Sequence, residues 1–208
     1  MASPTAGRAR SNYKADTIGQ IANVPAATPT PTPPGTVQIS GSVHSCANPA
    51  ADPVPGVTLT LTGSASITTT SDASGNYTLA SLPSGGNYLV TPAKAPVTPG
   101  GSGSAINTID IVAIQRHYLS VTIIPPGCRR SAGDVNGDAF INTIDAVAVQ
   151  RFYLNVGTGI ASTGQYRFNP VNRTYQGIST NQTGQNYDAY ILGDVAAPYA
   201  SRDGGTTE

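Results

Sequence analysis

Apolar and small polar residues alternate along the first half of the chain. The alternation begins at Thr36 and is divided by Pro, Gly, Asn and Asp into the stretches TVQISGSVHSC, GVTLTLTGS, ITTTSDASGNYTLASL and NYLVTPAK. A period of two places every second side chain on the same face of a strand, and the dividing residues favour turns. The pattern therefore predicts half-buried antiparallel strands that form a small β-sandwich over residues 36–96.

The second half of the chain contains a helical pattern that occurs twice. Residues 105–120 (AINTIDIVAIQRHYLS) and 140–155 (FINTIDAVAVQRFYLN) match at nearly every position. Such a repeat predicts two copies of one supersecondary unit that pack against each other across a pseudo-twofold axis. In each copy three apolar residues fall on a helical stripe, namely Ile109, Val112 and Ile114 or Ile144, Val147 and Val149.

Each predicted helix has a defined start. Asn107 and Asn142 stand where N-caps belong, and Asp110 and Asp145 follow three residues later, as in a capping box. The sequence thus predicts a two-helix module of EF-hand type over residues 97–157.

Oxygen-bearing side chains cluster in the loop before the second helix, GDVNGDAFINTID. Counted from Asp134, they fill the positions of a twelve-residue calcium loop, whose last carboxylate comes from the first turn of the helix. Calcium takes six to eight oxygen ligands at about 2.3–2.6 Å, and a loop of this kind surrounds the ion with them, whereas magnesium prefers fewer protein ligands. The alternative is an Asp/Asn-rich turn without a metal. The candidate Ca²⁺ ligands are Asp134, Asn136, Asp138, the carbonyl of Phe140, Asn142 and Asp145.

This stretch resembles a dockerin repeat, the calcium-loop-plus-helix module of secreted bacterial assemblies. The DVNGD loop, the Asn142-Thr143-Ile144-Asp145 corner, the Gln150-Arg151 pair and Leu154 carry the resemblance. Dockerins have two such repeats and bind cohesin domains through residues at the start and end of one helix. The resemblance implies partner contacts at Thr143, Ile144, Arg151 and Asn155 in one orientation, and at Thr108, Ile109, Arg116 and Ser120 in the other.

Two departures from the dockerin pattern bear on metal binding. In the first repeat the ligand positions hold Pro99, Gly101 and Gly103, so this copy is predicted to have lost its metal site, with Asp110 kept as a helix cap. In the second repeat Ala139 replaces the glycine of the sharp turn, and residues other than Gly resist a positive φ by roughly 1 kcal/mol. We therefore expect this loop to bend differently or to bind calcium more weakly.

The strand-rich part has a resemblance of its own. The phrase TTTSDASGNYTLASLPSGGNYLVTP is similar to the carboxypeptidase-regulatory-like family and to the B-type repeats of bacterial surface adhesins. The resemblance implies a hairpin at Asp72, Gly75 and Tyr77. It also implies a small β-sandwich that serves as a spacer or platform and has no catalytic residues of its own.

The composition restricts the partners of the chain. Charged residues make up 11 % of the 208 residues and the formal net charge is zero, against roughly 25 % charged residues in an average globular protein. This balance argues against nucleic acid or an anionic membrane as the partner, and membrane insertion is not expected because no run is long or apolar enough for a transmembrane helix. A weakly charged, hydroxyl-rich surface fits an extracellular or cell-surface protein of bacterial type, whose leader is not present in this chain.

The only two cysteines, Cys46 and Cys128, belong to no CxxC pair. In an oxidising compartment they are expected to form a disulfide that closes a loop of about eighty residues. The alternative is two free thiols.

The two ends of the chain are expected to differ. Residues 1–35 form an N-terminal arm and a Thr/Pro-rich linker, in which residues 15–24 show the spacing of a short helix or a docked strand. Residues 158–208 are predicted to be an extension that packs on the repeats through its tyrosines and ends in a flexible tail. Within it, Gly193-Asp194-Val195 echoes Gly133-Asp134-Val135, which raises the idea that Asp194 supplies a carboxylate near one of the repeats.

No arrangement of residues supports catalysis, because the chain lacks a GxSxG elbow, a phosphate-cradling loop and a recognisable Ser/His/Asp set. Two non-catalytic functions remain. In the first, the chain is a calcium-stabilised subunit that binds copies of itself through its arm and builds a fibre. In the second, the dockerin-like module anchors a secreted enzyme or adhesin to a cohesin-like scaffold domain.

Overall fold

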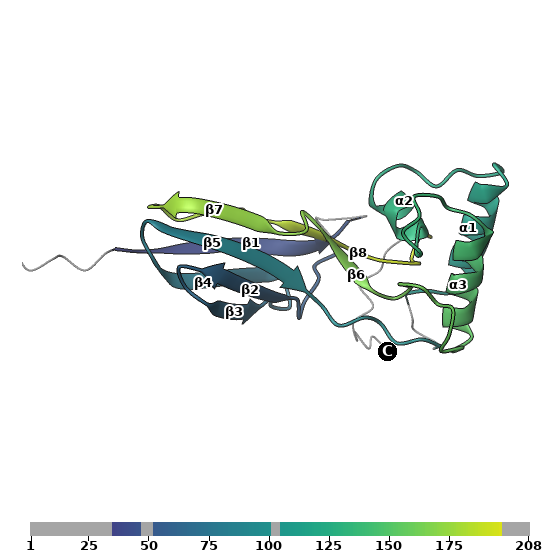
Figure 1. Ribbon diagram of the computed structural model, residues 1–208, viewed down its shortest axis with the longest axis horizontal. Coiled ribbons are helices and arrows are strands. Elements are labelled where there is room, and N and C mark those ends of the chain that lie inside the picture. Colours follow the sequence, from purple (N-terminus) through teal and green to yellow (C-terminus); the bar gives the residue numbers. More distant parts are fainter. Residues whose placement is uncertain (1–34, 47–51, 101–104, 197–208) are drawn as a thin grey trace, which may run out of the picture. The chain divides into compact units, whose positions relative to one another are not determined.

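The computed structural model describes residues 35–46, 52–100 and 105–196, which form two four-stranded sheets and three helices (Figure 1). The predicted fold class, mixed and mainly β, is confirmed. Residues 15–24, predicted to be a docking arm, lie outside the described residues, as do Gly101 and Gly103.

The alternating stretches form the five N-terminal strands. They are β1 (Thr36–Ser45), β2 (Thr58–Gly63), β3 (Ile67–Thr70), β4 (Asn76–Pro83) and β5 (Gly86–Ala93). In β5 buried and exposed residues alternate without interruption. The two-residue period therefore identified these strands and the face that each one buries.

Three more strands come from the C-terminal part of the chain: β6 (Tyr166–Asn169), β7 (Arg173–Ile178) and β8 (Tyr187–Ile191). One sheet has the order β4-β1-β8-β6, and the other has the order β3-β2-β5-β7. Within them β1 and β8 run parallel, whereas the other paired strands are antiparallel. A parallel pair needs a long crossover, and here the connection from β1 to β8 includes all three helices.

These C-terminal strands differ from the predicted division of the chain. The sandwich was expected to end at residue 96 and residues 158–208 to pack on the repeats, yet β7 pairs with β5 and β8 pairs with β1. The tyrosines that suggested a packed extension are responsible, because Tyr175 and Tyr187 are buried in the sandwich core. The Tyr187 hydroxyl donates a hydrogen bond to the Val90 carbonyl in the other sheet, at 3.1 Å.

The sandwich core lies between the two sheets and is made of aliphatic and tyrosine side chains. Its buried members are Val37, Ile39, Val43, Val54, Val57, Leu59, Leu61, Tyr77, Leu79, Leu82, Tyr88, Val90, Tyr175, Ile178, Tyr187 and Ala189.

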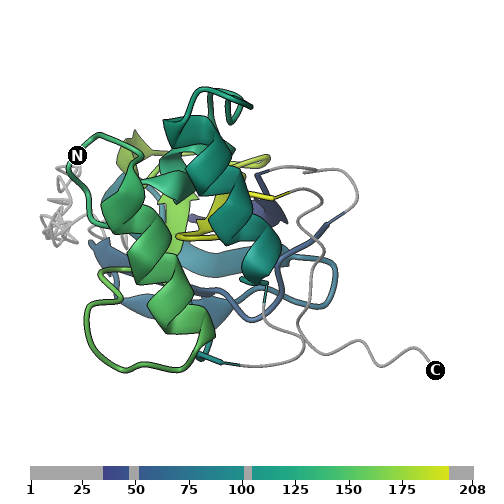
Figure 2. The same cartoon turned by 90° about the vertical axis from the view of Figure 1, so that its right-hand side faces the viewer.

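The helices are α1 (Thr108–Tyr118), α2 (Cys128–Gly133) and α3 (Thr143–Tyr153). Asn107 and Asn142 cap α1 and α3 with complete capping boxes, as predicted, whereas the short α2 was not predicted. Helices α1 and α3 lie side by side (Figures 1 and 2). No helix of the described residues is long and apolar enough to cross a membrane.

A second hydrophobic core lies among the helices. It combines residues of the helices and their flanking segments with two residues of the segment after β8: Ile106, Ile111, Ile114, Ile124, Ala132, Val135, Ala146, Ala148, Val149, Phe152, Leu192 and Val195. The segment after β8 therefore does pack on the repeats, although the strands before it belong to the sandwich.

The predicted disulfide is present. Cys46, which follows β1, is bonded to Cys128, the first residue of α2, and the two Cα atoms are 6.0 Å apart. A disulfide cross-link thus joins the sandwich to the helices in addition to the main chain.

Candidate calcium loop and helix face

The candidate loop runs from the end of α2 to the first turn of α3. Asp134 is the C-cap of α2, and its carboxylate accepts hydrogen bonds from the backbone of the loop that follows. One carboxylate oxygen accepts the backbone N–H groups of Gly137 at 2.7 Å and Asp138 at 3.1 Å, and the other accepts that of Ala139 at 2.8 Å. The loop therefore closes around the side chain at its first position.

The next two candidate ligands continue this arrangement. Asn136 Oδ1 accepts the N–H of Asp138 at 3.1 Å, and Asp138 Oδ1 accepts the N–H of Phe140 at 2.9 Å. The Asn136 amide also donates to Asp138 Oδ2 at 2.9 Å. Hydrogen bonds from the Asn136 side chain and from the Phe140 backbone lower the pKa of Asp138.

Asp145 closes the loop from inside α3. Its side chain is fully buried, with Oδ1 accepting the N–H groups of Val135 at 3.0 Å and Asn136 at 3.4 Å, and Oδ2 accepting that of Asn142 at 2.9 Å. Burial raises the pKa of Asp145, and the nearby negative charge of Asp134 raises it further. A buried carboxylate beside a second carboxylate favours a bound cation, because opposite charge offsets both desolvation and repulsion.

The donor set fits a hard cation. It comprises three carboxylates, two amides and the Phe140 carbonyl, and it contains no sulfur or imidazole. Asp134 Oδ1 and Asp145 Oδ1 each accept two hydrogen bonds, which use both of their lone pairs. The other oxygens of Asp134 and Asp145 and both oxygens of Asp138 each accept one of the bonds described above, so these oxygens are the ones that could bind an ion. Among the described residues, no group of three or more His, Cys, Asp or Glu side chains forms a metal cluster. The calcium prediction therefore depends on the amide and carbonyl oxygens as well as on the carboxylates.

The sharp turn of the loop contains two residues with positive φ. Gly137 has φ +77° and Ala139 has φ +70°. Ala139 thus adopts the left-handed conformation that the position requires, although alanine disfavours it. The loop therefore forms the sharp turn with alanine in place of the glycine of the dockerin pattern, and the backbone at Ala139 is strained.

Asp110, at the equivalent position of the first repeat, is also fully buried. Burial raises its pKa, while hydrogen bonds from four backbone N–H groups, including its own, act in the opposite direction. Oδ2 accepts the N–H of Asn107 at 2.8 Å, and Oδ1 accepts those of Val195 at 2.9 Å and Ala196 at 2.8 Å. The sequence signal for the contact between Asp110 and residues 195–196 was the similarity of Gly193-Asp194-Val195 to Gly133-Asp134-Val135. That similarity suggested the Asp194 side chain, whereas the backbone N–H groups of the next two residues make the contact.

The predicted partner-binding positions lie on the solvent side of the helix pair. Thr108, Ile109, Arg116 and Ser120 are exposed, as are Thr143, Ile144 and Asn155, whereas Arg151 is partly buried. The Arg151 guanidinium donates to the carbonyl and to the hydroxyl of Thr158, at 2.6 and 3.0 Å. This bond pair fixes its side chain along the end of α3.

Apolar residues extend this surface. Of each predicted helical stripe only Ile114 or Val149 is buried, whereas the other stripe residues face solvent. We call the exposed set the helix face. It consists of three pairs of equivalent residues: Ile109 and Ile144, Val112 and Val147, and Leu119 and Leu154, with Ile109 64 % and Ile144 59 % exposed. A duplicated apolar surface of this kind is typical of a protein-binding site.

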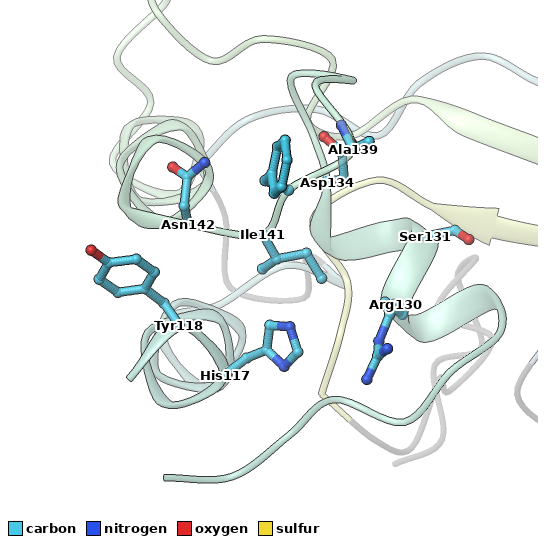
Figure 3. Close-up of a pocket in the computed structure, with 9 residues that line it drawn as sticks. His117, Tyr118, Arg130, Ser131, Asp134, Ala139, Ile141 and Asn142 are labelled. Atoms are coloured by element: carbon cyan, nitrogen blue, oxygen red, sulfur yellow. Dashed lines mark hydrogen bonds between the residues drawn. The ribbon is translucent and has the colours of Figure 1, made fainter. Parts of the chain in front are cut away.

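A pocket of about 610 Å³ lies between the candidate loop and the end of α1. Figure 3 shows His117 and Tyr118 of α1 on one side and Ile141 and Asn142 of the loop on the other, with Arg130 and Ser131 of α2 beside them. His117 Nδ1 accepts the N–H of Ile124 at 3.1 Å, and the Arg130 guanidinium donates twice to the Ile124 carbonyl, at 3.2 and 2.9 Å. The histidine and the arginine therefore hold the connection between α1 and α2.

Comparison with known proteins concerns the sandwich. The family model of the carboxypeptidase regulatory-like domain matches residues 38–122, a range that includes most of β1, all of β2 to β5, and α1. The match agrees with the β-sandwich, and domains of this family are non-catalytic and immunoglobulin-like. No curated protein matches the chain.

Proposed function

We propose that this chain is a non-catalytic, extracellular assembly protein, in which a bound calcium ion stabilises the helical pair and the sandwich serves as a rigid platform. The observation that supports the proposal is that one twelve-residue loop carries five oxygen-bearing side chains, at Asp134, Asn136, Asp138, Asn142 and Asp145, and leads directly into α3 of the exposed helix face. The disulfide and the weakly charged composition agree with a location outside the cell.

The first mode of assembly is self-association into a surface structure or fibre. In this mode the N-terminal arm of one molecule docks on the next, and a contact between two different surfaces propagates without closing. A sheet edge is a suitable acceptor for an extended segment, and β4, β6, β3 and β7 are the outer strands of the two sheets. The low charge of the chain supports this mode, because it limits repulsion between copies.

The second mode is anchoring to a cohesin-like domain, and the helix face favours it. The exposed Ile109, Val112 and Leu119 of α1 have equivalents in α3, and exposed polar residues flank both sets. A partner surface with a complementary apolar centre and polar rim would bury these residues on binding. In this mode the chain tethers a secreted enzyme or adhesin to a scaffold.

Sedimentation and negative-stain microscopy of the full chain, with calcium and with a chelator, distinguish the two modes. Filaments that form with calcium, and are lost in a variant lacking residues 1–34, support self-association through the arm. A chain that stays monomeric at high concentration with calcium contradicts it. Binding of a purified cohesin domain, lost in Ile109→Glu/Ile144→Glu and retained in Thr68→Glu/Thr78→Glu on the sandwich, supports anchoring. A failure of every cohesin tested to bind contradicts that mode.

A further inference from the structure

The buried aspartates of the two repeats make the same contacts with different parts of the chain. In the second repeat Asp145 accepts the N–H groups of Val135 and Asn136, which lie in its own loop. In the first repeat Asp110 accepts the N–H groups of Val195 and Ala196, which lie 85 and 86 residues away. In both repeats the second carboxylate oxygen accepts the N–H of the helix N-cap.

The glycines before these contacts extend the equivalence. A Cβ atom on Gly133 would lie 2.8 Å from Ile141 Cδ1, and a Cβ atom on Gly193 would lie 3.3 Å from the Cδ1 of Ile106, the residue equivalent to Ile141. A Cβ atom on Gly193 would also lie 2.8 Å from Thr163 Cγ2. Gly193 favours glycine because its φ is +98°, whereas a side chain at Gly133 would require the flexible end of Ile141 to shift.

The segment formed by residues 193–196 is anchored on its other side by α2. The Arg129 guanidinium donates two hydrogen bonds to the Val195 carbonyl, at 2.9 and 2.6 Å, and the Gly193 N–H donates to the Ala132 carbonyl at 2.7 Å. Val195 is fully buried in the helical core. These contacts hold the segment against α1 and α2 at once.

We propose that residues 193–196 act as a strap that replaces the lost first half of the first loop and holds α1 in place without a calcium ion. The strap acts through backbone N–H groups, and Ala196 stands where the second repeat has Asn136, so the side-chain oxygen of that ligand position is missing. Pro99, the residue 35 positions before Asp134, offers no side-chain oxygen, and Asp194 of the strap, which is buried, stands at that position instead.

The consequence is that calcium controls one half of the helical pair. The strap continues directly from β8, so α1 is tied to the sandwich whether or not calcium is present. The start of α3 depends on the candidate calcium loop instead. This inference rests on the proposed function insofar as it assigns calcium to the second repeat, and it predicts that removal of calcium loosens α3 while α1 keeps its exposed surface.

Amide hydrogen exchange, resolved to single residues in the full chain, tests the strap. With chelator, exchange at Val135, Asn136 and Asn142 is expected to accelerate at least about tenfold, whereas Val195 and Ala196 change by less than about threefold. Asp110→Ala is expected to expose Val195 and Ala196 with and without calcium, and the matched variant Asp145→Ala to expose Val135 and Asn136. Should Asp110→Ala fail to fold, Ala196→Pro removes one of the two donors, and exchange at Val195 serves as the readout.

Other outcomes overturn separate parts of the inference. Chelator-dependent exposure of Val195 and Ala196, or two calcium ions per chain of which Asp110→Asn loses one, would show that the strap is half of a metal site. In that case the strap proposal fails while the proposed function stands. Unchanged exchange in both loops on chelation would remove the calcium role from the second repeat. The strap would then be judged by Asp110→Ala alone, and protected Val195 and Ala196 in that variant would refute it.

Discussion

Cys46 and Cys128 join the end of β1 to the start of α2, and 82 positions of sequence separate them. The loop that the bond closes therefore contains β2 to β5 and α1. Its main effect is expected on the unfolded chain, which loses conformational freedom when two distant residues are linked.

Replacement of both cysteines, Cys46→Ser with Cys128→Ser, is expected to lower the free energy of unfolding by about 3–5 kcal/mol. Denaturant unfolding of the variant and of the wild-type protein measures the difference. The wild-type protein in reducing agent is the control and should match the variant. Equal stability of the oxidised protein and the variant would contradict this account.

Loss of a loop carboxylate is expected to remove the effect of calcium on stability. An ion that binds only the folded loop adds about 2.7 kcal/mol when free calcium exceeds its Kd a hundredfold. Asp134→Ala or Asp138→Ala should therefore lower the melting temperature in calcium and make it independent of chelator.

Asp72→Ala is a matched control for these variants. The Asp72 carboxylate accepts the N–H groups of Ser74 and Asn76 in a turn of the sandwich, at 2.9 and 2.8 Å. Its loss should lower the melting temperature equally with and without calcium. A melt that remains chelator-sensitive in both Asp134→Ala and Asp138→Ala would refute the assignment of these ligands.

Ala139→Gly is expected to stabilise the protein by roughly 1 kcal/mol, because glycine adopts the φ of +70° at this position without strain. The same change should tighten calcium binding, as measured by isothermal titration calorimetry. Gly137→Ala is the reverse experiment, since Gly137 has φ +77° and no atom within 4 Å of an added Cβ. It should destabilise the loop by a similar amount, and an unchanged stability in both variants would contradict the strain argument.

Acidification is expected to destabilise the protein through His117. Burial, together with the nearby charge of Arg130, lowers the pKa of His117, and Asp134 lines the same pocket. The folded state thus binds this proton less readily than the unfolded state, so the contribution of His117 is complete above about pH 6.5 and decreases as the pH falls toward the lowered pKa. Protonation also removes the Nδ1 acceptor of the Ile124 N–H.

Thermal melts between pH 5 and 8 measure this effect. His117→Gln is expected to flatten the pH dependence, whereas His44→Gln, at the other histidine, should leave most of it. A profile that is the same in the wild type and in His117→Gln would assign the dependence to other groups.

Local pattern was sufficient for the parts of the fold that are stabilised locally. Alternation identified β1 to β5 because each of these strands buries one face, and Asn107 and Asn142 marked the helix starts because an N-cap acts on residues next to it. The candidate ligands could be proposed from sequence because they all fall within one twelve-residue segment, and calcium binding by them stays a prediction.

Long-range pairing was not visible in the same way. In β6 the residues Tyr166 and Phe168 alternate with polar residues, but the strand is only four residues long, and β7 alternates poorly. Nothing in the sequence of β8 indicates that it lies parallel to β1. The exposure of Ile109 and Ile144 agrees with the contact positions that the dockerin resemblance implies, but the apolar stripe alone did not predict it, because such a stripe is typical of both a buried and a partner-binding helix face. The strap was missed in its detail because Asp110 is satisfied by backbone groups, which carry no residue signature.

The placement of β7 and β8 has a consequence for biosynthesis. Neither sheet is complete until β7 and β8 have left the ribosome, because β8 pairs with β1 and β7 pairs with β5. While the helices are being made, the nascent chain holds two incomplete sheets with open edges, where another chain could pair. The order of translation and the order of assembly therefore differ in this protein, and the sandwich closes only after residues as late as Ile191 have emerged.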